Sequence, residues 1–265
     1  QTIERGFPAQ NTGYYTAEPT YSLMVREALK LGFKLIAYDA FPKCDPFNEA
    51  PEKCQNLREQ AQAKNLFEQV FKKNPKAKMI VHVGYGHLDK KGGDANWPWI
   101  PMGKYFWQLT QIEPFSVDQT FFFEKGESKL NSPLYEQVSA TYDLRVPSVL
   151  VERNTNTPFV YSKYVDHYDI QVFLPKLRYN NNRPGWKSEL PLIQGKVFKK
   201  FQCPLNHRCL LQAVLKKECK DDFVPVDQTM VTSSETKLFL IPGSYILRMV
   251  DEQDRVLKIQ DFLMK

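Results

Sequence analysis

The 265-residue sequence lacks most of the patterns that assign a chain to a functional class. No apolar run reaches the roughly 18 residues that a transmembrane helix requires, so we predict no membrane span. The formal charge is +6, but lysine and arginine are spread along the chain, which argues against nucleic-acid binding. The sequence has no P-loop, GxGxxG, GxSxG or CxxC motif, and neither internal repeats nor low-complexity tracts. Function must therefore be sought in less regular patterns.

The composition is ordinary for a folded globular protein, with 42% hydrophobic and 25% charged residues. The sequence starts with Gln1 and shows no signal peptide, so we interpret it as a processed protein or a fragment. At this length the chain can form one large domain or two domains of ordinary size.

Five cysteines are present, and four of them form two local brackets. Cys44 and Cys54 flank a loop rich in Pro, Asp and Asn, and Cys203 and Cys209 flank Pro-Leu-Asn-His-Arg. Such brackets suit disulfides in an exported protein. Two alternatives remain. One is free thiols, and the other is a poorly spaced zinc site made by Cys203, His207, Cys209 and Cys219.

The first half of the chain alternates strand and helix patterns. Residues 33–38 and 79–83 are short apolar runs that predict strands, and residues 55–73 between them have helical spacing. A strand, a helix and a second strand form a βαβ unit with two parallel strands. We therefore expect an α/β domain over residues 1–145, made of a parallel sheet with flanking helices.

Another helix is predicted before the first of these strands. Residues 16–31 carry an apolar stripe at helical spacing, and Thr16 is the expected N-cap. Gly32 occupies the position after the C-terminus, where glycine is favoured.

After about Asp143 the pattern changes to short strand-like runs separated by Pro, Asn and Gly. Helical stripes are absent there, which is typical of a β-sandwich or a small barrel. The clearest hairpin joins residues 244–250 to residues 255–260. We place a domain boundary near residue 145 and expect a β-sandwich-like C-terminal domain over residues 146–265.

The residues that follow the predicted strand at 79–83 are the strongest indication of a site. In an open α/β sheet, the carboxyl ends of parallel strands deliver polar groups into the ligand crevice. His87 lies there, beyond two glycines, and is a candidate acid/base group or metal ligand, or alternatively a loop cap. His82 is a candidate supporting residue, or alternatively a core histidine.

Three further residues are expected at the same edge of the sheet. Asp39 closes the strand at 33–38 and is a candidate base, metal ligand or partner of Arg58, or alternatively a turn residue. Arg58 can bind a carboxylate or phosphate bidentately, or alternatively pairs with Glu59 or Asp39. Tyr85 is a candidate pocket residue or phenolate ligand of haem iron, although such tyrosines more often pack at a rim.

Two segments are similar to a known superfamily. They are Arg58-Glu59-Gln60-Ala61-Gln62-Ala63-Lys64-Asn65-Leu66 and Gly84-Tyr85-Gly86-His87-Leu88. They resemble segments of the superfamily that joins erythromycin-esterase-like proteins, ChaN-like haem-uptake proteins and TraB/Tiki-type proteins. The resemblance implies an α/β sheet with carboxylates, histidines and an arginine around a crevice. It also implies a function among the hydrolases, some of them metal-dependent, or the ligand binders.

On this resemblance we expect a hydrolase-like domain that accepts a small-molecule or peptide ligand. His87 is then the acid/base group or a metal ligand, and His82 supports it. Arg58 binds an anionic group or a developing oxyanion, and Asp39 orients one of these groups or acts as base. The alternative is a non-catalytic haem or small-ligand binder with Tyr85 or His87 on the iron. The expected cofactor is therefore a divalent metal or haem, and the expected localisation is outside the cytoplasm.

A third hypothesis places recognition in the C-terminal domain. Trp186 and the tyrosine-rich segment 161–179 suggest an interaction module or a carbohydrate-binding module there. This hypothesis assigns no chemistry to the histidines.

Overall fold

The structure of the chain is a computed structural model. It describes residues 2–45, 47–93, 96–180, 183–191, 193–204, 207–220, 222–232 and 235–265. The fold is mixed α/β and consists of helices and several small sheets. Contacts divide it into unit 1, which comprises Gln1–Leu35 and Arg178–Lys265, and unit 2, which comprises Ile36–Leu177.

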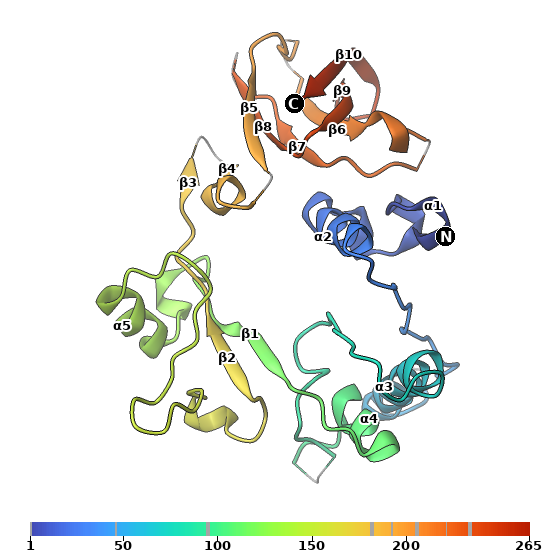
Figure 1. Ribbon diagram of the computed structural model, residues 1–265, viewed down its shortest axis with the longest axis vertical. Coiled ribbons are helices and arrows are strands. Elements are labelled where there is room, and N and C mark those ends of the chain that lie inside the picture. The colour runs from blue at the N-terminus through green and yellow to red at the C-terminus, as the bar shows by residue number, and fades with distance from the viewer. Residues whose placement is uncertain are drawn as a thin grey trace. The chain divides into compact units, whose positions relative to one another are not determined.

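Unit 1 is built on antiparallel strands (Figure 1). Its four-stranded sheet has the order β10, β9, β6, β7, with bounds Val256–Met264, Gly243–Val250, Leu210–Leu215 and Asp227–Met230. A second, two-stranded sheet pairs β5 (Gln194–Phe198) with β8 (Thr236–Leu240). The β9–β10 pair is the hairpin that the sequence predicted, with Val250 opposite Val256.

Alternating side chains of these strands form the core of unit 1. In β9, Tyr245, Leu247 and Met249 are buried, and the residues between them are more exposed. This period of two places one face of the strand in the core and the other outside it. Buried residues of β5, β6 and β8 join the same cluster, so the two sheets share one core.

The N-terminal helices of unit 1 are α1 (Thr2–Arg5), the 3₁₀ helices Gln10–Thr12 and Tyr15–Ala17, and α2 (Pro19–Lys30). The N-cap predicted for α2, Thr16, was two residues too early. Glu18 caps it by accepting from the Tyr21 amide at 2.6 Å, whereas the Thr16 hydroxyl donates to the Gly13 carbonyl. Gly32 has a φ of +82°, as its predicted position requires.

Short elements complete unit 1. They are β3 (Tyr179–Asn180), β4 (Arg183–Pro184) and two 3₁₀ turns, Gly185–Ser188 and Lys216–Glu218.

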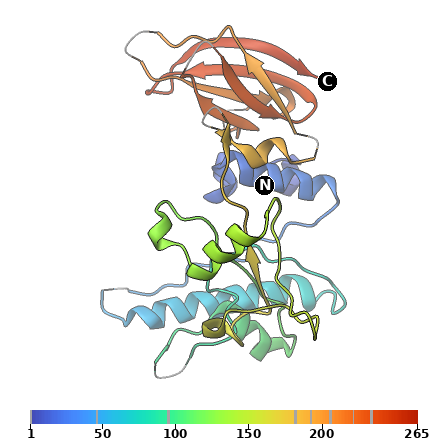
Figure 2. The same ribbon diagram turned by 90° about the vertical axis from the view of Figure 1, so that its left-hand side faces the viewer.

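Unit 2 contains the longest helix, α3 (Pro51–Leu66), which continues as a π-helical turn over Phe67–Phe71 and is seen along its length in Figure 2. This agrees with the helix predicted for residues 55–73. The other elements are α4 (Met102–Thr110), α5 (Pro133–Thr141), two 3₁₀ turns at Ser128–Leu130 and Ser162–Tyr164, and the parallel strands β1 (Val117–Phe122) and β2 (Ile170–Phe173).

Two core clusters hold unit 2 together. One lies where α3 meets α4 and contains Ala63, Leu66, Met102 and Phe106. The other joins the β1–β2 pair to α5 and contains Phe122, Tyr135, Val138 and Phe173.

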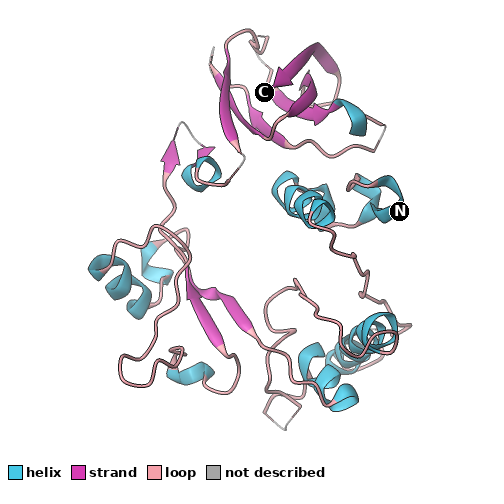
Figure 3. Cartoon of the chain, in the orientation of Figure 1, coloured by secondary structure: helices cyan, strands magenta, loops and turns pink. Residues whose placement is uncertain are grey.

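The strands predicted at residues 33–38 and 79–83 are not formed. Both segments are drawn as loop in Figure 3, and no described residue pairs with them in a β-ladder. Side chains of α3 and of the π-helical turn bind the first segment instead: Asn65 donates to the Tyr38 carbonyl at 2.9 Å, and Gln69 donates to the Ala37 carbonyl at 2.9 Å. The parallel pairing of unit 2 therefore comes from β1 and β2, not from the predicted βαβ unit.

The division into units also differs from the boundary expected near residue 145. That position lies inside unit 2, because the chain after it returns to pair β2 with β1. The first 35 residues belong to unit 1, where the Arg26 side chain of α2 bonds to Glu218.

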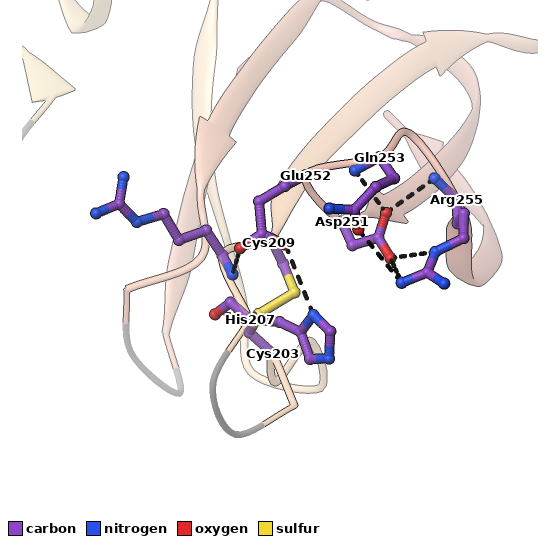
Figure 4. The surroundings of a disulfide bond; sticks show 8 residues. Cys203, His207, Cys209, Asp251, Glu252, Gln253 and Arg255 are labelled. Atoms are coloured by element: carbon purple, nitrogen blue, oxygen red, sulfur yellow. Dashed lines mark hydrogen bonds and ion pairs between the residues drawn. A yellow bond between two sulfur atoms is a disulfide. The ribbon is translucent and has the colours of Figure 1, made fainter.

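Both cysteine brackets are disulfides. Cys44 pairs with Cys54 in unit 2, and Cys203 pairs with Cys209 in unit 1 (Figure 4). Cys219 is a free thiol. The Cys203–Cys209 bond uses two of the four ligands of the zinc alternative, which the structure therefore contradicts.

The Cys203–Cys209 disulfide lies beside the β9–β10 turn (Figure 4). Glu252 of that turn accepts from the Arg208 amide at 2.7 Å. Asp251 closes the turn by accepting from the backbone amides of Gln253 and Arg255, both at 3.0 Å. The hydrogen bond from the Arg208 amide to Glu252 therefore connects the disulfide loop to the β9–β10 hairpin.

Over the part of the chain that the structure describes, no helix is long and apolar enough to cross a bilayer.

Candidate functional site

Helix α3 of unit 2 carries the polar residues around which the candidate site forms. Glu59 lies on the same helical face as Ala63 and Leu66, four and seven residues further on, and this face packs against α4. Arg58 is the neighbouring residue on the helix. The helix therefore carries a buried carboxylate at Glu59, and the Arg58 guanidinium projects from an adjacent face, because consecutive helical residues do not face each other.

Glu59 and His87 form a buried carboxylate–imidazole pair. The His87 Nδ1 lies 2.8 Å from a carboxylate oxygen of Glu59, and Glu59 is 0% exposed. Glu59 also accepts from the backbone amide of Met102 at 2.7 Å and from the Gln55 side chain at 2.6 Å. The first N–H of α4 thus meets a negative charge, which is the favourable arrangement at a helix N-terminus.

The tautomer of His87 follows from this contact. An ionised carboxylate can only accept hydrogen bonds, so the ring nitrogen that faces it must donate, and we assign the proton to Nδ1. Nε2 is then the basic nitrogen. The His87 side chain is 16% exposed, so its position is determined by the protein while part of the ring remains accessible.

The glycine before His87 is required by its surroundings. Gly86 has a φ of +88°, and a Cβ atom built on it would lie 2.7 Å from the Trp99 ring. The edge of the Trp99 ring meets the His87 ring, with centroids 6.0 Å apart. Asn56 of α3 holds the loop that carries Trp99. Its side chain donates to the Pro98 carbonyl and accepts from the Ile100 amide.

Asp39, in the loop before α3, forms a second pair with Arg58 of α3. Arg58 donates to Asp39 through Nε at 3.0 Å and Nη2 at 2.7 Å, and Gln62 donates to the same carboxylate at 2.6 Å. Burial raises the pKa of Asp39, but the hydrogen bonds from Arg58 and Gln62 outweigh it and leave that pKa below its usual range. The pair that the sequence suggested as one alternative for Asp39 and Arg58 is therefore present.

His82 keeps its expected supporting role only as a prediction. It lies in an extended segment where Val81 and Val83 pack against the α3–α4 cluster and His82 alternates with them as an exposed residue. The Nδ1 of His87 meets Glu59.

Tyr85 lies at a cleft within unit 2. Its side chain is 80% exposed. The cleft has a volume of about 750 Å³ and is lined by seven aromatic residues, Tyr85, Trp97, Trp99, Phe121, Phe123, Tyr164 and Tyr168. Polar residues at the cleft include Asp89, Asp118, Gln119, Thr120 and Lys125. This composition is typical of small-molecule sites, which are mostly apolar with a few convergent polar groups.

A second carboxylate–imidazole pair borders this cleft. Asp89 is 3% exposed, and its carboxylate oxygens lie 2.9 and 3.0 Å from Nδ1 of His167. The His167 ring stacks on Trp97, with centroids 5.9 Å apart. Burial, followed by the negative charges of Asp89 and Asp118, raises the pKa of Tyr168.

These donors do not make a metal site of three or more ligands. Glu59 with His87 and Asp89 with His167 each offer two, and over the described residues no group of three His, Cys, Asp or Glu side chains is placed to hold an ion. Structural and catalytic zinc sites use at least three protein ligands. We therefore derive no step through a metal.

Sequence reasoning missed Glu59, Asp89 and His167 as members of these pairs. For Glu59 a signal existed, because it is a carboxylate on the face of α3 that also carries Ala63 and Leu66. For Asp89 and His167 there was none, since they are 78 positions apart in the sequence.

No family model, no curated protein and no solved structure matches this chain. The superfamily resemblance therefore stays a prediction, and a function must be argued from the geometry of unit 2.

Proposed function

We propose that unit 2 carries a hydrolase-like site in which His87 is the acid/base group and Glu59 holds it. The observation that carries this proposal is the fully buried Glu59 carboxylate on Nδ1 of His87, 2.8 Å away. A carboxylate in that position selects one tautomer, orients the ring and stabilises the imidazolium when it forms. The same arrangement serves general bases in many hydrolases.

The proposed reaction is attack of water on an ester or amide carbonyl. His87 Nε2 takes a proton from the water as its oxygen bonds to the carbonyl carbon. The same nitrogen then returns the proton to the leaving alkoxide or amine as its bond to that carbon breaks. Arg58 binds an anionic group of the ligand or the developing oxyanion through Nη1, because Asp39 occupies its Nε and Nη2.

Asp39 has a positioning role in this proposal. Its contacts with Arg58 and Gln62 fix the guanidinium relative to α3. The sequence also offered Asp39 as a base, but a carboxylate whose pKa is lowered by these donors is a weaker base than an ordinary one.

We also propose a domain type for each of the two units. Unit 2, with its parallel strand pair and covering helices, is the α/β domain of the superfamily joining erythromycin-esterase-like, ChaN-like and TraB/Tiki-type proteins. Unit 1, with two antiparallel sheets on one core, is the β-sandwich-like domain. The two disulfides support export, since such bonds persist in oxidising compartments.

The test is hydrolysis of a panel of p-nitrophenyl esters and short peptides by the wild type and His87→Gln. Glutamine keeps a donor for Glu59 but has no basic nitrogen, so kcat/KM should fall about 10²- to 10⁴-fold. His207→Gln in unit 1 is the matched control, because it removes an imidazole outside the proposed site. Unchanged activity of a correctly folded His87→Gln protein would remove the assignment.

A second candidate is binding of haem or another small ligand without catalysis. The observation that favours it is Tyr85, which is exposed at an aromatic cleft and carries a phenol that can ligate iron. Added haem should then give a shifted Soret band that Tyr85→Phe changes and Tyr142→Phe does not. Tyr142 is the control because it is another exposed tyrosine of unit 2 that does not line the cleft. An identical spectrum for wild type and Tyr85→Phe would exclude this role of Tyr85.

A further inference from the structure

We propose that the aromatic cleft of unit 2 binds an organic cation, a substituted ammonium group with an apolar body. The cleft is the one of about 750 Å³ lined by Tyr85, Trp97, Trp99, Phe121, Phe123, Tyr164 and Tyr168. This inference goes beyond the proposed hydrolysis, since it concerns binding alone and is measured without turnover.

The walls of the cleft are largely aromatic. Aromatic rings attract cations through their negative faces, and tryptophan does so most strongly. Two rings of the cleft already carry an ammonium group of the protein itself. Lys125 Nζ lies over the Phe123 ring at 6.0 Å from its centroid, and Lys163 Nζ lies over the Tyr164 ring at 5.6 Å.

The cleft also contains two nearly buried carboxylates, Asp118 and Asp89. Asp118 is 7% exposed and accepts from the Thr120 amide, the Thr120 hydroxyl and the Gln171 side chain. Asp89 is 3% exposed and accepts from the Lys91 amide and meets the His167 ring. Within the described residues, no lysine or arginine side chain forms an ion pair with either of them.

Three other acidic residues of unit 2 do have a lysine or arginine partner. Asp39 pairs with Arg58, and Glu113 and Asp169 both pair with Lys90. Buried charges are normally paired, so Asp118, which is nearly buried and has no ion-pair partner among the described residues, favours a cation from outside.

The local charge has the opposite sign to that of the whole chain. The charged residues that line the cleft are Asp89, Asp118 and Lys125, whereas the chain carries a formal charge of +6. Burial raises the pKa of Tyr168, and the negative charges of the two aspartates raise it further. Lys125 is the cationic residue among those that line the cleft.

The chemistry of the lining selects an organic cation over a metal ion. Hard metal ions require several oxygen ligands, which an aromatic wall does not supply. An alkylated ammonium instead gains from the rings by cation–π attraction and by burial of its methyl groups.

The test compares choline with its neutral isostere 3,3-dimethylbutan-1-ol by isothermal titration calorimetry, and benzyltrimethylammonium with neopentylbenzene as a second pair. Each cation should bind at least about tenfold more tightly than its neutral counterpart. Equal affinities within each pair, or no saturable binding of either cation, would overturn the proposal.

Variants locate the binding. Asp118→Asn should weaken choline binding about tenfold and leave the neutral isostere unchanged, because only the charge is removed. Trp186→Phe, in unit 1, is the matched control and should leave both unchanged. Choline binding that Asp118→Asn does not alter would exclude the cleft as its location.

His87→Gln separates this inference from the proposed hydrolysis. It should retain choline binding while it loses hydrolysis. If the Asp118→Asn protein does not fold, the comparison of each cation with its isostere on the wild type still decides the inference.

Discussion

In unit 1 the buried carboxylates of Glu218 and Asp227 meet permanent cations, whereas in unit 2 those of Glu59 and Asp89 meet an imidazole. Arg26 donates to Glu218 through two nitrogens, at 2.9 and 2.7 Å. Asp227 accepts from Lys187 at 2.9 Å and also from Arg183.

The difference concerns what each pair can do. A guanidinium stays protonated at any pH a protein experiences, so the pairs of unit 1 hold elements together and move no proton. An imidazole changes its charge near neutral pH, so the pairs of unit 2 can exchange a proton with a ligand. Burial of a carboxylate is therefore a structural feature in one unit and the basis of the candidate site in the other.

We expect the largest loss of folding stability when the cation that pairs with a buried carboxylate is removed. Arg26→Met leaves Glu218 buried and unpaired, which should cost about 3–5 kcal/mol of stability in unit 1. Urea unfolding followed by far-ultraviolet circular dichroism measures this. Arg5→Met is the control, because its partner Asp222 is more exposed and the loss should be much smaller. Equal losses for both variants would contradict the structural role of the Arg26–Glu218 pair.

Substitution of Glu59 should cause the next largest loss of folding stability. Glu59→Ala leaves the Met102 amide, the Gln55 amide and the His87 ring without their acceptor, which should cost about 2–3 kcal/mol. Glu59→Gln keeps an acceptor and should cost less. Tryptophan fluorescence during urea unfolding reports unit 2, which holds three of the four tryptophans. If the alanine and glutamine variants unfold at the same urea concentration, these hydrogen bonds do not stabilise the site.

Substitution of Gly86 tests how the Trp99 ring packs beside His87. Gly86→Ala combines a left-handed backbone with a Cβ that displaces the Trp99 ring, and should cost about 1–2 kcal/mol. Gly84→Ala is the control, since its Cβ would meet only the His87 ring at 3.6 Å and its φ is not positive. The same fluorescence measurement applies. A neutral Gly86→Ala would mean that Trp99 is not held against the His87 segment.

Substitution of Asp39, whose side chain is 42% exposed, should cause the smallest loss of folding stability. Burial opposes its ionisation, but the donors Arg58 and Gln62 lower its pKa. The stabilisation is therefore present above the ordinary carboxyl pKa of about 3.9 and is lost as pH falls through the lower, folded-state pKa.

Asp39→Asn should remove this contribution. At neutral pH the loss should be at most about 1 kcal/mol, because solvent screens the pair. The stability of unit 2 should also fall less steeply in the variant than in the wild type as the pH is lowered below about 4. Identical pH profiles would show that the Asp39–Arg58 pair does not stabilise the folded unit.

Much of unit 1 was accessible from sequence because its signals are local. The alternation in residues 244–250 and the short turn after them predicted the β9–β10 hairpin. The same holds for the positive φ at Gly32 and for α3 in unit 2, since each depends on neighbours within a few residues.

The strands predicted at 33–38 and 79–83 show the limit of such signals. Their apolar runs predict an extended backbone that packs against helices, and Met79, Val81 and Val83 do pack on the α3–α4 cluster. A strand also requires a neighbouring backbone, and apolar periodicity contains no information about whether one is present.

The sequence by itself determined that the segments of α2 and α3 are helical, that the residues of β9 alternate and which cysteines are near neighbours, because each of these depends on spacing along the chain. Only the tertiary structure decided that His87 meets Glu59, that Asp89 meets His167 and that tryptophans lie beside both imidazoles. Those contacts form when distant segments pack together, and the choice among the available partners is made by the packing of the whole unit.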